Sequence, residues 1–176
     1  MNPRDRIVNT ACRLFYHQGY NSTGINQVIK EAEVAKASLY QYFPSKEDLL
    51  VEYLVITGNN TNDELKATAQ KHKSARQKVL ALFDFLLKFS KQQNFHGCNF
   101  LNIAAEIPKD NEKVKSLIRK QKNSLRNLFF EILKPAGKED LADELYLLFD
   151  AALISSKVHG HPWPIKTARQ IVEKLL

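Results

Sequence analysis

Apolar residues recur every three or four positions along most of the chain, which is the spacing of helices that bury one face. The clearest example is a single apolar stripe through residues 110–134, which predicts one long helix. Strand-like alternation of apolar and polar residues is hard to find, and the chain has only 6 glycines and 6 prolines. A chain of 176 residues is long enough to bury a core. The pattern therefore predicts an all-α fold of about nine helices.

The chain begins with signals for a first helix. Asn2 is a good N-cap, Pro3 suits the first helical position, and Asp5 lies in the first turn. Gly19 is expected to end this helix as a left-handed cap. Cys12 lies within the helix, and we interpret it as a core residue rather than as a redox-active thiol.

The next segment predicts two short helices joined by a tight turn. Gly24 can cap the first helix, and Gln27 is placed to reach back to it as in a capping box. Residues 33–35 are too few for anything but a turn, and residues 36–42 then form the second helix. After a proline that cannot continue this helix, Ser45 caps the start of another.

Two short helices that cross over such a turn make a helix-turn-helix, in which the second helix lies in the major groove of DNA. Hydroxyl groups and a lysine can donate to phosphates, and a glutamine can bond bidentately to adenine. The same spacing fits an ordinary helix hairpin in an all-α core, so spacing alone leaves both interpretations open. The outward positions of the second helix are Lys36, Ala37, Ser38, Tyr40, Gln41 and Tyr42.

The residue types in this segment form a specific motif. S-L-Y-Q-Y-F-P-S-K-E-D-L-L occupies residues 38–50, and a basic helix that ends in L-F-Y-H-Q-G-Y at residues 14–20 precedes it. Over residues 6–50 the chain closely resembles the TetR family of bacterial transcriptional repressors. The resemblance implies a dimeric, all-α regulator. Its three-helix DNA-binding domain would comprise residues 1–46, and its helical regulatory and dimerisation domain residues 47–176.

The resemblance also implies individual DNA contacts. Glu33 departs from the family, in which glycine usually makes the turn, so we expect a left-handed backbone at a non-glycine residue. Ile29 replaces a small residue that is usual where the helices cross. Family positions that hold phosphates match Thr23, Ser38, Tyr40, Tyr42 and Lys46. Family positions that tend to meet base edges match Asn26, Lys36, Ala37 and Gln41.

An interruption follows in the helix that starts at Ser45. Residues 58–60 read Gly-Asn-Asn, and Thr61 with Glu64 then forms the pattern of a second capping box. This predicts that one helix ends and another begins here. The break is either a hinge between two parts of the protein or a plain loop.

Residues 74–90 are apolar on nearly all sides, which predicts a central, buried helix. Its phenylalanines either line a ligand cavity or belong to a plain core. The candidate ligand-binding residues are Phe83, Leu86, Phe100 and Phe129.

The last two helices are predicted over residues 139–158 and after the turn at residues 159–164. Small residues on the first of them, including Ser155 and Ser156, would let a partner helix come close. In TetR-like proteins these two helices pack against their two-fold mates as a four-helix bundle. The resemblance therefore implies a homodimer formed through the last two helices.

Cysteine and histidine are too sparse for a metal site. Cys98 follows His96, and His159 and His161 share a turn, but neither pair supplies the three or four ligands that zinc takes. We predict no metal and no cofactor, and we interpret Cys98 as a packed thiol, with a sensing role left open. Two cysteines without metal-type spacing fit a reducing cytoplasm. We expect neither a membrane span nor a signal peptide.

The formal net charge of +7 suits a nucleic-acid partner, but most of the surplus lies in residues 71–134 rather than in the first fifty residues. We interpret the bases of the helix at residues 110–134 as a solvated face, with a second nucleic-acid surface or a site that attracts anionic ligands as the alternative. These bases are Lys113, Lys115, Arg119, Lys120, Lys122 and Arg126.

Together these features predict a ligand-responsive transcriptional regulator. Its expected role is a repressor that binds a palindromic double-stranded operator as a dimer and is released by a small-molecule inducer of unknown identity. An enzyme is not expected, because the chain has no glycine-rich phosphate loop, no nucleophile elbow and no paired histidine ligands on a helix. The alternative is a helical protein-interaction module without sequence-specific DNA binding.

Overall fold

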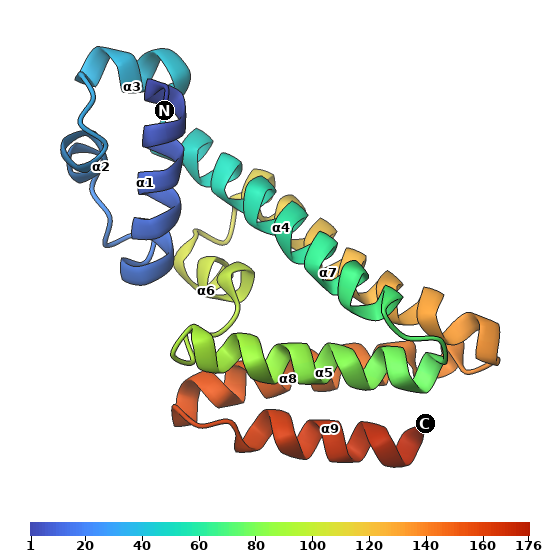
Figure 1. The fold of residues 1–176 in the computed structure, drawn as a ribbon. Coiled ribbons are helices and arrows are strands. Elements are labelled where there is room, and N and C mark those ends of the chain that lie inside the picture. Colours follow the sequence, from blue (N-terminus) through green and yellow to red (C-terminus); the bar gives the residue numbers. More distant parts are fainter. The chain divides into compact units, whose positions relative to one another are not determined.

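The computed structural model describes residues 1–176 and contains nine α-helices and two short 3-10 helices, η1 and η2, without strands (Figure 1). The predicted all-α fold is therefore confirmed. In chain order the elements are α1 Pro3–Gln18, α2 Ile25–Glu31, α3 Lys36–Tyr42, α4 Lys46–Gln70, α5 Ala75–Gln92, α6 Asn99–Glu106, α7 Glu112–Leu133, η1 Lys134–Ala136, η2 Glu139–Leu141, α8 Ala142–His159 and α9 Trp163–Leu175.

The chain forms two compact units. Unit 1 comprises Met1–Asn59 and Asn99–Arg119, and unit 2 comprises Asn60–Cys98 and Lys120–Leu176. Unit 1 thus holds α1 to α3, α6 and the first parts of α4 and α7, while unit 2 holds α5, α8, α9 and the remainder of α4 and α7. The predicted boundary between residues 46 and 47 separates a DNA-binding domain from a regulatory domain. It is a division by function rather than by compactness, and it stays a prediction.

Unit 1 has a small core in which α1 contacts both α2 and α3. Asn2 caps α1 as predicted, because its side chain accepts a hydrogen bond of 2.8 Å from the backbone N–H of Asp5. The first helix contributes Ile7, Leu14 and Phe15, all of which are buried. Burial of these apolar side chains is the main term that holds three short helices together.

Two local expectations in unit 1 were wrong. Gly19 follows α1 with φ 90° and ψ 159°, a glycine conformation that is not the left-handed helical one. Gln27 does not reach back to cap α2, because its side-chain amide donates instead to Glu31, 2.8 Å away on the next turn. A carboxylate four residues further along the same helix face offers the amide a charged acceptor.

The predicted break at residues 58–60 was also wrong, because α4 runs unbroken from Lys46 to Gln70. A glycine inside a helix costs only about 1 kcal/mol relative to alanine, and continuing the helix keeps every backbone hydrogen bond. The helix also buries Leu65 and Ala69 beyond this point. The boundary between the two units nevertheless falls at Asn59.

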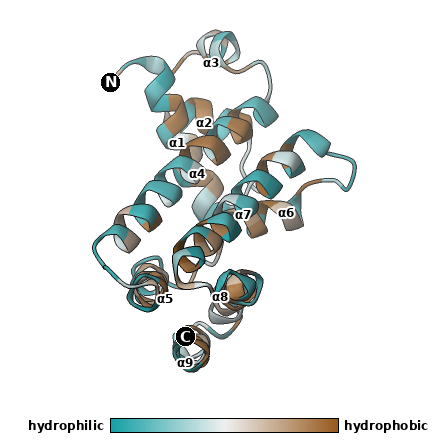
Figure 2. Cartoon of the chain, turned by 90° about the vertical axis from the view of Figure 1, so that its right-hand side faces the viewer, coloured by the Kyte–Doolittle hydropathy of each residue, from teal (hydrophilic) through white to brown (hydrophobic).

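Unit 2 is a larger helical core to which α4, α5, α7, α8 and α9 contribute. The helix α5 contacts both α8 and α9 and buries Val79, Leu82, Phe83 and Leu86, but Arg76, Asp84 and Lys88 are exposed, so one face is buried rather than nearly all sides as predicted. Three aromatic rings meet inside the unit, with ring centroids 5.4 Å apart for Phe83 and Phe149 and 5.8 Å apart for Phe129 and Phe149. Figure 2 shows brown and teal segments alternating along the helices, as expected for amphipathic helices that bury one face.

None of the helices is long and apolar enough to cross a membrane.

Candidate nucleic-acid interface

The turn between α2 and α3 has the predicted strained residue. Glu33 adopts φ 53°, the left-handed region that the motif requires and that glycine usually supplies. The backbone N–H of Val34 donates to the carbonyl of Ile29 at 3.2 Å, which closes the turn. Val28 and Leu39 are completely buried on either side of it. The two helices therefore form a helix-turn-helix, with Ile29 half-buried where the family has a small residue.

The outward face of α3 is uncovered. Tyr40 and Tyr42 are 40% and 41% exposed, which is unusual for large aromatic side chains in a compact unit. The side chains of Lys36 and Gln41 are exposed beside them. Of the remaining predicted contacts, Asn26 and Ala37 are exposed, and Ser38 and Lys46 are half-buried.

Thr23 differs from the other predicted contacts. It is completely buried, and its hydroxyl donates to the carbonyl of Gly19 at 2.7 Å. The side chain thus holds the loop between α1 and α2 rather than presenting a free hydroxyl at the surface. Its burial was not evident from the sequence, because a threonine before a helix is usually an exposed cap.

The start of α4 completes the candidate interface. The hydroxyl of Ser45 donates to the carboxylate of Asp48 at 2.7 Å and accepts from its backbone N–H at 3.1 Å, so Ser45 caps the helix as predicted. The ammonium of Lys46 lies over the ring of Tyr20, 4.2 Å from its centroid. Burial lowers the pKa of Lys46, and the negative charge of Glu106 opposes this shift.

Sequence reasoning missed Glu106, the last residue of α6. Its carboxylate accepts a hydrogen bond of 2.7 Å from the backbone N–H of Asn21, and its backbone carbonyl accepts one of 2.8 Å from the Asn21 side chain. Eighty-five residues separate these partners in the chain. No local pattern reports a contact over such a separation, so this pairing required the structure.

A second set of long-range contacts ties the starts of α4 and α7 together. The ammonium of Lys113 donates to Asp48 at 2.8 Å, and the amide of Asn111 donates to Glu47 at 2.6 Å. The hydrogen bond from Lys113 lowers the pKa of Asp48. Both carboxylates in the first turn of α4 therefore have hydrogen-bond donors at the start of α7, one of them charged, within unit 1.

Lys122 lies in a buried cluster rather than on a solvated face, which corrects the interpretation of the bases on α7. Its ammonium donates to the carboxylate of Asp150 at 2.8 Å and to the sulfur of Cys98 at 3.3 Å. The side chains of Lys122 and Asp150 are each only 13% exposed. Burial acts to lower the pKa of Lys122, but the nearby Cys98 and Asp150 outweigh it and raise this pKa.

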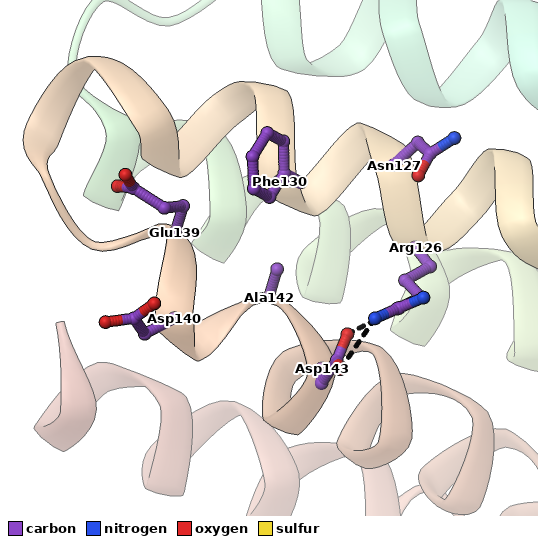
Figure 3. A pocket seen from close by; sticks show the side chains of 7 residues that line it. All are labelled: Arg126, Asn127, Phe130, Glu139, Asp140, Ala142 and Asp143. Carbon is purple, nitrogen blue, oxygen red and sulfur yellow. Dashed lines mark hydrogen bonds and ion pairs between the residues drawn. The ribbon is translucent and has the colours of Figure 1, made fainter.

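The predicted ligand-binding residues are packed into the two cores. Phe83, Leu86 and Phe129 are buried in unit 2, and Phe100 is buried in unit 1. A separate surface pocket of about 380 Å³ lies in unit 2 where α7, η2 and the start of α8 meet (Figure 3). It does not include the predicted residues, and its lining is Arg126, Asn127, Phe130, Glu139, Asp140, Ala142 and Asp143.

The other candidate metal and thiol residues do not assemble. No three side chains among histidine, cysteine, aspartate and glutamate lie close enough together to hold a metal ion. Cys12 is half-buried in α1, and both cysteines are free thiols. Burial, together with the charge of Glu52, raises the pKa of Cys12 from 9.0 to about 11.

We expect the raised pKa to slow alkylation of Cys12. At pH 8 its thiolate fraction should be roughly 100-fold lower than in an unfolded chain, because only the thiolate reacts. The measurement is the rate of iodoacetamide labelling in a Cys98→Ser variant, which leaves Cys12 as the one thiol. The same variant in urea supplies the unfolded reference, and equal rates in the two conditions would contradict the prediction.

Comparisons with known proteins agree with this geometry. The model of the family "Bacterial regulatory proteins, tetR family" matches residues 7–53. The chain is 31% identical over 163 residues to the uncharacterized HTH-type transcriptional regulator YxaF of Bacillus subtilis, covering 89% of this chain and 81% of YxaF. It is 36% identical over 78 residues to the HTH-type transcriptional regulator QacR of Staphylococcus aureus, covering 44% of this chain and 42% of QacR.

The fold has a close counterpart among solved structures. A TetR-family transcriptional regulator from Streptomyces coelicolor matches with a TM-score of 0.90 and 26% identity, over 98% of this chain and 87% of that one. The matched segment at residues 7–53 contains α1, the whole helix-turn-helix and the start of α4. The chain therefore belongs to the TetR family of bacterial transcriptional regulators.

Proposed function

We propose that this regulator is a repressor that binds a palindromic operator as a homodimer and is released by a small-molecule inducer. The observation that carries the proposal is the uncovered face of α3, on which two tyrosines, a lysine and a glutamine stand exposed beside one another. Exposed aromatic and polar side chains on the second helix of a helix-turn-helix suit contacts to phosphates and base edges.

In the proposed complex α3 enters the major groove. Gln41 reads an adenine through its amide, while the hydroxyls of Tyr40 and Tyr42 donate to phosphates on either side. We expect contacts to base edges from Lys36 in the first turn of α3 and from Asn26 on α2. Thr23 has a supporting role, because its buried hydroxyl fixes the loop that precedes α2.

The proposed dimer forms through α8 and α9. Each helix has an exposed apolar stripe at helical spacing that nothing in unit 2 covers. On α8 the stripe consists of Leu147, Ala151, Ile154 and Val158. On α9 it contains Trp163, Ile171 and Leu175. A two-fold axis through these stripes would bury them against a second copy and present two copies of α3 to successive major grooves.

The proposed inducer acts by selecting one conformation. A ligand can release the operator only if it binds the DNA-incompetent state more tightly than the competent one. The candidate ligand-binding residues remain Phe83, Leu86 and Phe129 in unit 2 and Phe100 in unit 1, and each lies in a packed core that would have to open to admit a ligand.

The alternative is a helical module that uses the helix-turn-helix shape to contact another protein. Exposed tyrosines would also serve such an interface. The two functions differ in what the face recognises, because a protein partner would not depend on the base sequence of DNA.

We expect Gln41→Ala to weaken binding to the operator by about 1–3 kcal/mol and to relax the base preference at one position in each half-site. The loss arises because alanine cannot form the two hydrogen bonds to adenine. The measurement is a titration with a fluorescent duplex carrying the DNA upstream of the protein's own gene, with random DNA as competitor.

The matched control is Tyr42→Phe in the same helix, in which only a hydroxyl proposed to contact a phosphate is lost. Tyr42→Phe should weaken binding to all sequences equally, since phosphates have no sequence information. If the unsubstituted protein shows no preference over random DNA at moderate salt, the repressor function is wrong. If Gln41→Ala retains the base preference at every position of the half-site, the assignment of Gln41 is wrong.

A further inference from the structure

The carboxylate of Glu106 sits in the turn that follows α1. It accepts a hydrogen bond of 2.7 Å from the backbone N–H of Asn21, and the side-chain amide of Asn21 donates to the backbone carbonyl of Glu106 at 2.8 Å. Asn21 is the donor in both hydrogen bonds, and the two separate donor–acceptor pairs fix both the position and the orientation of the turn. A hydrogen bond to a carboxylate is stronger than one between neutral groups.

A side chain at Gly19 would crowd the carboxylate of Glu106. A Cβ atom built there would lie 3.0 Å from one carboxylate oxygen of Glu106 and 3.2 Å from the other. Gly19 also has φ 90°, which side chains rarely adopt. The backbone at Gly19 and Asn21 therefore packs closely against the Glu106 carboxylate.

The same turn supplies the ring on which Lys46 rests. Tyr20 directly precedes Asn21, and its ring packs edge-on against Phe15 at 5.3 Å. The Lys46 ammonium lies 4.2 Å from the centroid of the Tyr20 ring. A cation over an aromatic face is held there by the ring quadrupole, so a change in the turn changes where the ammonium stands.

We propose that Glu106 is a positioning residue for DNA binding, which holds the turn at Asn21 and thereby places the Lys46 ammonium for a phosphate. This inference rests on the proposed function and on the family resemblance, which places Lys46 at a position that holds a phosphate. Glu106 itself does not touch DNA in this scheme. Its effect passes through Asn21 and the Tyr20 ring to Lys46, over contacts that all lie within unit 1.

A double-mutant cycle tests the proposal. We expect Lys46→Ala to weaken DNA binding about tenfold and to reduce the salt slope of log K by about 1, as for a lost phosphate contact. Glu106→Ala should produce the same two changes. The double variant should be no weaker than either single variant, because both substitutions remove one contact.

Glu106→Gln is the matched control. Glutamine keeps an oxygen that can accept the Asn21 N–H but has no charge, so this variant should bind DNA at least as tightly as the unsubstituted protein. Additive losses in the double variant, or a loss in Glu106→Gln as large as in Glu106→Ala, would overturn the positioning role. Circular dichroism of each variant establishes that the helices remain folded.

A second readout does not depend on DNA. The ring of Tyr20 should shift the NMR signals of the Lys46 ε-methylene upfield, and Glu106→Ala should abolish that shift while Glu106→Gln retains it. An unchanged shift in Glu106→Ala would overturn the inference even if DNA binding were lost. If the shift behaves as expected but the unsubstituted protein binds no DNA, the proposed function fails and the role of Glu106 in placing Lys46 stands.

Discussion

We expect Asp150→Ala to lower the free energy of unfolding by about 3–5 kcal/mol, the usual cost of removing one partner from a buried ion pair. The substitution leaves the Lys122 ammonium buried, with the sulfur of Cys98 as its remaining partner. A thiol is a weak acceptor and cannot replace a carboxylate. The measurement is urea unfolding followed by circular dichroism, with the slope checked for two-state behaviour.

Two further variants make this test specific. Asp143→Ala also removes a carboxylate from an ion pair on α8, but its partner Arg126 is exposed, so the unfolding midpoint should hardly change. The double variant Lys122→Met/Asp150→Leu replaces both charges by apolar groups of similar size. It should recover most of the stability, because no buried charge is then left unpaired.

The outcome decides what the cluster contributes. If Asp150→Ala unfolds at the same urea concentration as the unsubstituted protein, the ammonium of Lys122 must reach water in solution and the cluster is not buried. If Asp150→Ala is destabilised but the apolar double variant is not rescued, packing around Asp150 rather than charge pairing explains the loss. Both results would contradict the prediction.

The helix-turn-helix was predictable because its signals are local. A cap such as Ser45 acts within a few positions, so its role follows from spacing and side-chain chemistry. The left-handed turn residue Glu33 was expected from the family resemblance, in which glycine usually occupies this position. The apolar pattern likewise predicted that α5 contributes to the core, although it indicated burial on nearly all sides and the helix buries one face. The family motif also lies wholly in this region. It indicated the fold of the entire chain because it identified a family whose members share that fold.

The false break in α4 has a different cause. Gly58 and the two asparagines after it lower helix propensity, and sequence reasoning treats such a cluster as a loop. The penalty is only about 1 kcal/mol for a glycine, and a long helix that buries apolar residues further along easily outweighs it. Local propensity is decisive only where packing does not favour one outcome.

The polar contacts that organise the two units were beyond prediction because their partners lie far apart in the chain. Lys122 meets Asp150 across 28 residues, and Asn21 meets Glu106 across 85. On a helical wheel Lys122 resembles the other bases of α7, yet only the packing of α8 makes it a buried residue. Charge patterns show which side chains are available for pairing, whereas the tertiary fold determines the pairs.

Disrupting the apolar stripe of α8 should convert the protein into a monomer and cost more operator affinity than any single change on α3. Leu147 and Val158 are 62% and 75% exposed, the most exposed aliphatic side chains of that stripe. In the proposed dimer, Leu147→Glu/Val158→Glu would place two carboxylates from each copy in an apolar interface, where unpaired charges cost several kcal/mol. Sedimentation velocity at micromolar concentration should show one copy instead of two.

The expected loss of operator affinity is about 10²–10⁴-fold, because a monomer forfeits the second half-site and with it the high effective concentration that the dimer provides. Val55→Glu is the matched control, since Val55 is also an exposed valine, 42% accessible, but lies on α4. That variant should remain dimeric and keep its operator affinity.

A Leu147→Glu/Val158→Glu protein that stays dimeric would show that α8 does not form the interface. A monomer that still binds the full operator tightly would contradict the two-fold mode of binding, because in that mode affinity depends on both copies of α3.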